Sequence, residues 1–329
     1  MTLKSSQNVL VTGAGGFIGS HLAEHLVSAG VKVRAMVRYN SRGCRGWLEQ
    51  SSLKDAMEIC AGDIRDPDFV NDCVRGMNCV FHLAALIGIP YSYVAPESYV
   101  ETNIVGTLNV LQAARRNGLI RVVHTSTSEC YGTAQAVPIT EDHPLRGQSP
   151  YAATKIGADK LVESFHLAFG LPAVVVRPFN TFGPRQSARA IIPTIISQVI
   201  AGSDFVRVGN TDPSRDLNYV SNTVEGFVMA AESAKAVGRT INLGSSREIK
   251  IRDLIVLIAD ILGKTVAVET ESCRVRPQSS EVERLLADHS LATELLGWRP
   301  RVSLEEGLAH TIKWMADNAE RYRPSEYAV

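Results

Sequence analysis

Residues 8–19 read NVLVTGAGGFIG, a short apolar run that leads directly into a glycine-rich segment. Apolar residues then recur at helical spacing up to Gly30, and a second apolar run covers residues 31–37. This pattern predicts a strand, a glycine turn, a helix and a strand, the unit that binds dinucleotides. Gly13 would permit the tight turn, Gly16 the close approach of a pyrophosphate, and Gly19 the packing of the helix on the strand. The N-terminus of the helix would then face the phosphates.

The same alternation continues along the first half of the chain. Apolar runs at 57–60, 79–83 and 121–124 indicate further strands, and 97–117 and 150–169 indicate helices. Strands that alternate with helices form a parallel sheet covered on both faces. We therefore predict an α/β protein with a Rossmann-type doubly wound sheet. After residue 177 the elements become shorter and polar residues more frequent.

Several residues beside the glycines are predicted to line a cofactor site. Asp63 and Ile64 follow the third strand and are placed to meet the adenine, and small residues end the fourth strand, where a cofactor could lie close. The predicted cofactor residues outside the glycines are Phe17, Ile18, Arg38, Asp63, Ile64, Leu83, Ala84, Ala85, Tyr151 and Lys155.

The end of the second strand departs from the usual dinucleotide pattern. An acidic residue often binds the adenosine ribose there, but this chain has Val37 followed by Arg38, with Arg42 nearby. An arginine would bind a 2′-phosphate that a carboxylate would repel. The sequence therefore favours NADP over NAD.

Composition excludes several functional classes. The 329 residues carry no formal net charge, and the pI is near 7.1, so there is no electrostatic footprint for nucleic acid or an acidic membrane. The six cysteines show no CxxC pair and no metal-ligand spacing. The start of the chain lacks the long apolar stretch of a signal peptide, and no apolar run is long enough to span a membrane. We expect a cytoplasmic protein without a bound metal, nucleic acid or membrane partner.

Residues 125–155 carry the candidate catalytic groups. A strand ends in Thr125-Ser126-Thr127-Ser128-Glu129, and a later helix opens with Ser149 as cap and Pro150 in its first turn. Tyr151 and Lys155 lie four residues apart and so share one helix face. A nearby ammonium lowers the pKa of a phenol, which makes the phenol a usable base.

Together these motifs resemble the extended short-chain dehydrogenase/reductase family. The matching pieces are Thr12-Gly13-x-x-Gly16-x-x-Gly19, Asp63-Ile64, His82-Leu83-Ala84-Ala85, Asn103, Thr127, Tyr151-x-x-x-Lys155 and residues 177–185. Within that family the chain is most similar to nucleotide-sugar 4,6-dehydratases, especially those that act on GDP-N-acetylglucosamine in legionaminic acid pathways. The segments 89–93, 125–129, 183–189 and 276–282 carry this closer similarity.

The resemblance implies a domain division and a substrate. Residues 1–177 would form the dinucleotide-binding domain, and 178–329 mainly a smaller C-terminal substrate-binding domain, with some segments returning to the sheet. A nucleotide-diphosphate sugar would be the ligand, and the chain would form a homodimer or a dimer of dimers through the helices at 97–117 and 150–169. The predicted substrate-binding residues are Tyr91, Asn180, Arg185, Arg215 and Arg276.

For a 4,6-dehydratase, the resemblance implies a role for each catalytic residue. Tyr151 would take the proton of the sugar 4-hydroxyl, with Lys155 and Thr127 assisting, and Glu129 would remove the proton at C5. Ser128 departs from the pattern, because many 4,6-dehydratases carry an acid there for the leaving 6-hydroxyl. Either Glu129 does both jobs or Ser128 orients a water.

Three other functions stay open. A 4-epimerase would need only Tyr151, Lys155 and Thr127. A UDP-glucuronate decarboxylase would need no leaving-group acid but would need a cation for the substrate carboxylate. A non-catalytic dinucleotide sensor would have no use for the activated phenol.

Overall fold

A seven-stranded sheet forms the centre of the computed structural model, which describes residues 3, 7–275 and 277–322. The strands lie in the order β11-β6-β5-β4-β1-β2-β3, and every neighbouring pair is parallel. The sheet confirms the predicted doubly wound fold, and each strand expected in the first half is present. The strands are β1 (Asn8–Thr12), β2 (Lys32–Arg38), β3 (Met57–Gly62), β4 (Cys79–His82), β5 (Arg121–Thr125), β6 (Ala173–Pro178) and β11 (Thr240–Leu243).

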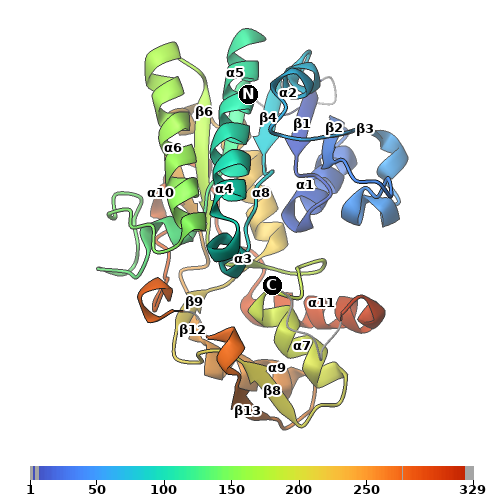
Figure 1. The fold of residues 1–329 in the computed structure, drawn as a ribbon, viewed down its shortest axis with the longest axis vertical. Coiled ribbons are helices and arrows are strands. Elements are labelled where there is room, and N and C mark those ends of the chain that lie inside the picture. The colour runs from blue at the N-terminus through green and yellow to red at the C-terminus, as the bar shows by residue number, and fades with distance from the viewer. Residues whose placement is uncertain (1–2, 4–6, 276, 323–329) are drawn as a thin grey trace.

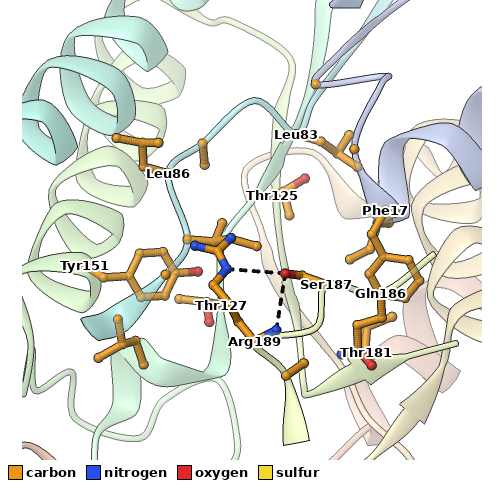
Figure 2. Close-up of a pocket in the computed structure, with 18 of the residues that line it drawn as sticks. Phe17, Leu83, Leu86, Thr125, Thr127, Tyr151, Thr181, Gln186, Ser187 and Arg189 are labelled. Atoms are coloured by element: carbon orange, nitrogen blue, oxygen red, sulfur yellow. Dashed lines mark hydrogen bonds between the residues drawn. The ribbon is translucent and has the colours of Figure 1, made fainter. Parts of the chain in front are cut away.

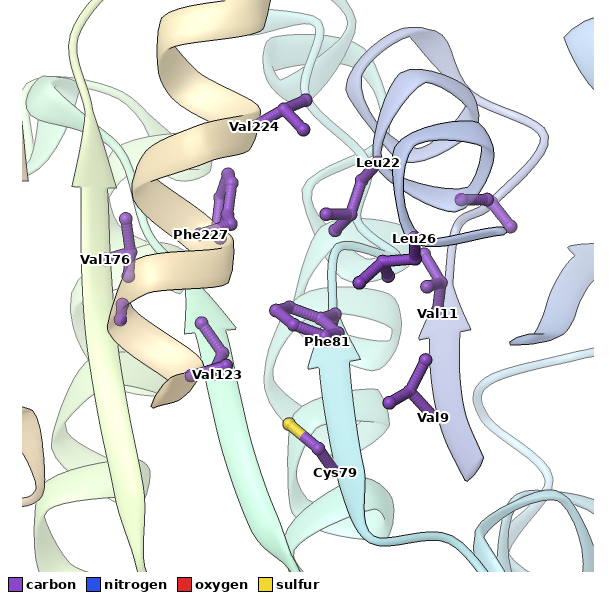
Figure 3. Close-up of a cluster of buried hydrophobic side chains, with 14 of the residues drawn as sticks. Val9, Val11, Leu22, Leu26, Cys79, Phe81, Val123, Val176, Val224 and Phe227 are labelled. Atoms are coloured by element: carbon purple, nitrogen blue, oxygen red, sulfur yellow. The ribbon is translucent and has the colours of Figure 1, made fainter. Parts of the chain in front are cut away.

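Helices cover both faces of the sheet (Figure 1). The helices α1 (Phe17–Ser28), α8 (Val220–Glu232) and α10 (Ser290–Leu296) pack on one face, and α2 (Pro67–Val74), α5 (Gly106–Arg116) and α6 (Pro150–Phe169) on the other. Alternate residues of β1 serve the two layers: Val9 and Val11 join the first core (Figure 3), and Leu10 joins the second. Burial on both faces explains why these strands are continuous apolar runs.

The helix expected over 97–117 is interrupted. It comprises α4 (Pro96–Tyr99), one π-helical segment (Val100–Val105) and α5, and it follows the short helix α3 (Ile89–Val94). Asn103 lies in the π-helical segment, where its amide donates to the carbonyl of Leu86 and accepts from the Leu86 N–H. Such widened turns commonly occur at functional sites, and this one fixes the chain just after β4.

A smaller lobe lies below the sheet (Figure 1). Its elements are α7 (Ile191–Ile200), α9 (Ile251–Ile261) and α11 (Leu304–Ala316), with the strand pairs β7 (Thr181–Phe182) and β10 (Asn218–Tyr219), β8 (Phe205–Val208) and β13 (Ala267–Thr270), and β9 (Ser214–Asp216) and β12 (Glu248–Lys250). The three helices share a third apolar core with β7 and β8. The later segments α8 and β11 return to the sheet, and the domain division at residue 177 stays a prediction.

No helix in the described ranges has the length and apolar character needed to cross a membrane. Within the same residues, no three His, Cys, Asp or Glu side chains gather as a metal site. All six cysteines are free thiols.

Candidate active site

A cleft of about 980 Å³ opens at the carboxyl ends of the central strands, between the sheet and the smaller lobe. Its walls come from the glycine turn after β1, the segments after β4 and β5, the start of α6, and the residues after β6 (Figure 2). The chain order reverses between β1 and β4. Ligands of doubly wound proteins bind beside such a reversal.

The glycine turn has the shape that a dinucleotide requires. Gly13 has φ +69°, and a Cβ there would lie 2.9 Å from the backbone nitrogen of Ala84. A Cβ on Gly19 would lie 2.2 Å from the carbonyl oxygen of Gly13, so only glycine allows α1 to begin this close to the turn. Gly16 caps α1 and lines the cleft, as do Gly13 and Gly19. The residues present therefore fit a pyrophosphate at the start of α1.

The other predicted cofactor residues also line the cleft. They are Phe17, Ile18, Arg38, Asp63, Ile64, Leu83, Ala84, Ala85, Tyr151 and Lys155. The Thr12 hydroxyl accepts hydrogen bonds from the N–H groups of Leu83 and Ala84, both at 3.1 Å. This side chain therefore holds the end of β4 against the glycine turn.

Tyr151 and Lys155 lie on the first turns of α6, which begins as predicted. The Ser149 hydroxyl accepts from the Ala152 N–H at 3.1 Å, and Pro150 is the first helical residue. Burial raises the pKa of Tyr151, and the neighbouring Thr127 hydroxyl opposes this rise. Lys155 donates to the carbonyl of Thr125 at 2.6 Å, and burial lowers its pKa. The ammonium is thus held at the end of β5 by the strand itself.

Thr127, Ser128 and Glu129 form the turn that follows β5. The Thr127 side chain accepts from the Glu129 N–H at 3.2 Å and so caps the short helix η4 (Ser128–Tyr131). Ser128 is buried and Glu129 is partly exposed. All three line the cleft together with Tyr151 and Lys155, so the five predicted catalytic residues come together in one cavity.

A buried ionic network supports this turn from behind. Asp159, one helical turn after Lys155, pairs with Arg177 of β6 at 2.9 Å and accepts from the Ser126 hydroxyl at 2.7 Å. His124 lies 3.3 Å from the other carboxylate oxygen. Burial by itself would raise the pKa of Asp159, but His124, Arg177 and Lys155 lower it to about 2. The sequence analysis did not identify this network.

Three predicted substrate residues line the cleft. They are Tyr91, Asn180 and Arg215. Arg215 is buried, donates to the Ser214 carbonyl and forms an ion pair with Glu281, both at 3.0 Å. Arg274 also lines the cleft, which the sequence analysis did not predict.

Arg185 lies elsewhere, against α1. Its guanidinium forms two hydrogen bonds to the Glu24 carboxylate, at 2.8 and 3.0 Å, and a third to the Ser20 hydroxyl. It is not among the residues that line the cleft, and a guanidinium held by a carboxylate suits inter-lobe packing better than the phosphate contact we expected. Arg276 lies outside the described residues.

Arg189 is a cleft residue that the sequence analysis did not name as a site residue. Its side chain points into the cavity beside Ser187 (Figure 2). The segment 183–189 was singled out only for its family resemblance, and an arginine in an irregular segment gives no signal of its direction. Only the fold brings it toward Tyr151.

These features define a class of protein. A dinucleotide turn, a buried Tyr-x-x-x-Lys pair and a second lobe over the same cleft characterise the extended short-chain dehydrogenases/reductases. A family model described as GDP-mannose 4,6 dehydratase matches residues 10–311. The chain belongs to this family.

Individual relatives carry out more than one reaction. The chain is 31% identical to a dTDP-glucose 4,6-dehydratase from an Actinoplanes species, covering 94% of this chain and 98% of that one. It is 33% identical to a UDP-glucose 4-epimerase from Mycolicibacterium smegmatis, covering 94% and 99%. The crystal structure of DesIV, a dTDP-glucose 4,6-dehydratase from Streptomyces venezuelae with NAD and TYD bound, superimposes with a TM-score of 0.88 at 29% identity, covering 97% of this chain and all of that one.

Proposed function

We propose that the chain is a nucleotide-sugar 4,6-dehydratase that acts on an NDP-N-acetylhexosamine. The observation that carries this proposal is Glu129, an acid on the same turn as Thr127 in the cavity that holds Tyr151. Dehydration requires a base at C5 in addition to the groups that act at C4, and Glu129 supplies one. We propose an N-acetylhexosamine as the sugar because the segments 125–129 and 183–189 resemble those of dehydratases that act on GDP-N-acetylglucosamine.

Each proposed catalytic residue then has a defined role. Tyr151 takes the proton of the 4-hydroxyl, and Thr127 hydrogen-bonds the same oxygen. Glu129 removes the C5 proton, which the ketone at C4 has made acidic, and water leaves from C6. Bound NAD or NADP would accept the hydride from C4 and supply it again at C6. Lys155 holds its position through the Thr125 carbonyl and would bind the nicotinamide ribose.

Glu129 also serves the leaving hydroxyl in this proposal. Ser128 is buried, and a serine hydroxyl is too weak an acid to protonate a leaving group at neutral pH. Glu129 gains a proton when it acts at C5, and it can pass that proton to the 6-hydroxyl. A proton from the solvent would then reach C5 as the hydride returns to C6. This sequence of steps needs one carboxyl group rather than two.

The test uses Glu129→Gln, which keeps the size of the side chain but cannot accept a proton. The first oxidation should survive, so mixing the variant with substrate should give the absorbance of reduced nicotinamide without product release. The wild type should incorporate solvent deuterium at C5, and the variant should not. Full dehydration by the variant would show that the base lies elsewhere.

A 4-epimerase is the second candidate, because an epimerase is among the relatives. It would invert C4 without exchange at C5, and Glu129→Gln would turn over nearly normally. A UDP-glucuronate decarboxylase would release carbon dioxide from a glucuronate substrate. A dinucleotide sensor would retain cofactor but turn over no sugar nucleotide. One panel of UDP-, GDP- and dTDP-sugars, read by mass spectrometry and NMR, separates all four.

We propose NADP as the resident cofactor. Support comes from the cofactor end of the cleft, where Arg38 and Arg45 both line the wall and Val37 occupies the usual place of an acidic residue at the end of β2. A guanidinium is well suited to a 2′-phosphate. Related structures contain NAD, so the two nucleotides are the alternatives to compare.

We also propose a homodimer, or a dimer of such dimers, in the cytoplasm. The helical faces that would pair are α5 and α6 with the π-helical segment before α5. A reducing compartment is supported by the six free thiols.

A further inference from the structure

Arg189, near Tyr151 in the cleft, has no acidic partner in the described part of the chain. Ser187 orients the Arg189 side chain. The Ser187 hydroxyl accepts hydrogen bonds from the Arg189 side-chain Nε at 3.3 Å and from the Arg189 backbone N–H at 3.4 Å (Figure 2). Within the described residues, neither Nη group has a hydrogen-bond acceptor. Arg215 and Arg185, by contrast, are each paired with a glutamate. The two Nη groups therefore remain available to a ligand.

The guanidinium is held on one particular side of Tyr151. A Cβ on Gly88 would lie 2.6 Å from the Arg189 Nη1, so the glycine leaves the space that the guanidinium fills. The Tyr99 hydroxyl donates to the Gly88 carbonyl at 2.5 Å, and the Tyr99 ring packs edge-on against Tyr151, with centroids 6.3 Å apart. Arg189, which comes from the segment between β7 and α7, thus lies in the cavity against the segment after β4, whereas Glu129 reaches it from the segment after β5.

The shape of a hexose then determines which part of the sugar the Arg189 guanidinium can contact. With C4 beside Tyr151, the ring atoms C3 and C5 extend to opposite sides, and C1 with its diphosphate points away. Glu129 occupies the C5 side in the proposed reaction, and Asn180 and Arg215, which also line the cleft, are assigned to the diphosphate. The side left for Arg189 is the C2–C3 edge.

A guanidinium donates hydrogen bonds and accepts none. Its ligand on this edge must therefore carry an acceptor, and a carbonyl or carboxylate oxygen is a stronger acceptor than a sugar hydroxyl. A carboxylate would lie at C6, on the side of Glu129, where two negative charges would repel each other. A carbonyl oxygen on the nitrogen at C2 meets both requirements.

We propose that Arg189 binds the carbonyl oxygen of an acylamino group at C2 and makes the site selective for N-acylated hexoses. This inference rests on the proposed function, because Glu129 is assigned to C5 there. Ser187 and Gly88 are positioning residues that aim the guanidinium. The selectivity comes from a charge-assisted hydrogen bond to the carbonyl oxygen, because the C2 hydroxyl of a plain hexose is a weaker acceptor.

The test measures binding rather than turnover. Tyr151→Phe holoenzyme, which should not consume substrate, is titrated calorimetrically with matched pairs of nucleotide sugars, UDP- or GDP-N-acetylglucosamine against the corresponding glucose compound, and with the nucleoside diphosphate alone. We expect the acetamido sugar to bind about 10- to 100-fold more tightly than the glucose compound, as for a hydrogen bond to a charged group. Arg189→Met, which keeps length and volume, should reduce this ratio to about threefold or less.

Two further variants serve as controls for the binding experiment. Gly88→Ala should lower the same ratio, because its Cβ displaces the guanidinium. Arg252→Met, on the exposed arginine of α9 that pairs with Asp212, should leave it unchanged. An unchanged ratio in Arg189→Met would overturn the proposal, and so would an equal loss of affinity for the nucleoside diphosphate, which would mean that Arg189 binds phosphate.

The proposed function can fail independently of this inference. If no sugar nucleotide loses the mass of water with the wild type, the dehydratase assignment is wrong, but the binding ratios can still be read. If the wild type dehydrates NDP-glucose and NDP-N-acetylglucosamine with equal kcat/KM and binds them equally, Arg189 does not select the sugar.

Discussion

Tyr151 is the residue on which the proposed chemistry depends most. Its phenol lies in the cavity beside Thr127, and burial raises its pKa, so the phenol must lose its own proton before it can take that of the 4-hydroxyl. Tyr151→Phe removes one hydroxyl and little else. We expect turnover to fall by about 10²- to 10⁴-fold, while the thermal unfolding midpoint and the amount of bound cofactor stay near those of the wild type. Wild-type rates in the variant would refute the assignment.

His124 makes the stability of the protein depend on pH. Burial, followed by the charge of Lys155, lowers the pKa of His124 to about 4 from its ordinary value of 6.5. The unfolded chain then binds this proton more readily than the folded protein, so stability should fall as the pH drops from about 6.5 to about 4. The slope should approach about 1 kcal/mol per pH unit.

Urea unfolding at a series of pH values measures this slope. His124→Gln removes its own titration but leaves that of His82, whose pKa burial also lowers, so we expect a flatter profile between about pH 6.5 and 4 even if the variant is less stable throughout. A slope equal to that of the wild type would mean that another group binds the proton. Asp159 contributes at lower pH, because its lowered pKa of about 2 gives stability that is lost only below the ordinary range of a carboxyl group.

At the scale of elements, the prediction of a dimer rests on α5 and α6. The two helices pack side by side on one face of the sheet (Figure 1). Leu111 and Phe165, two large apolar residues of these helices, are buried in the core of the subunit itself. Val100 and Val105 of the π-helical segment, however, are 45% and 40% exposed. The predicted interface therefore lies nearer the π-helical segment.

Light scattering at micromolar concentration tests this prediction. The wild type should have at least twice the mass of one chain, and the double variant Val100→Asp/Val105→Asp should shift toward the monomer, because two charges would have to be buried without partners. As a control, Val256→Asp changes an exposed valine of α9 and should leave the mass unchanged. A monomeric wild type would contradict the prediction.

At the scale of the whole molecule, the cleft between sheet and smaller lobe should retain its cofactor, because the proposed reaction returns the nucleotide to its starting state. Denaturing the purified protein and identifying the released nucleotide by mass spectrometry is the direct measurement. We expect NADP or NADPH, with Arg38→Ala shifting the released nucleotide toward NAD because a phosphate ligand is lost. Release of NAD or NADH alone from the wild type would show that Arg38 does not select the cofactor.

Local pattern by itself predicted the sheet and most of the site. Period and composition locate β1 to β5, since strands buried on both faces must be apolar throughout. The glycine turn follows from spacing, because Gly13 and Gly19 meet steric limits that only glycine satisfies. The Tyr151 and Lys155 pair follows from helical periodicity together with the cap at Ser149.

Only the tertiary structure determined in which direction the long polar side chains point and which residues they contact. Arginines look alike in sequence, yet Arg185 is held by Glu24 against α1, Arg177 is buried with Asp159, and Arg189 reaches into the cavity beside Gly88. The direction of a flexible side chain depends on partners far away in sequence, which no local pattern encodes. The sequence therefore determined the fold and the residues of the proposed chemistry at C4, while only the assembled cleft determined which arginine points toward Tyr151.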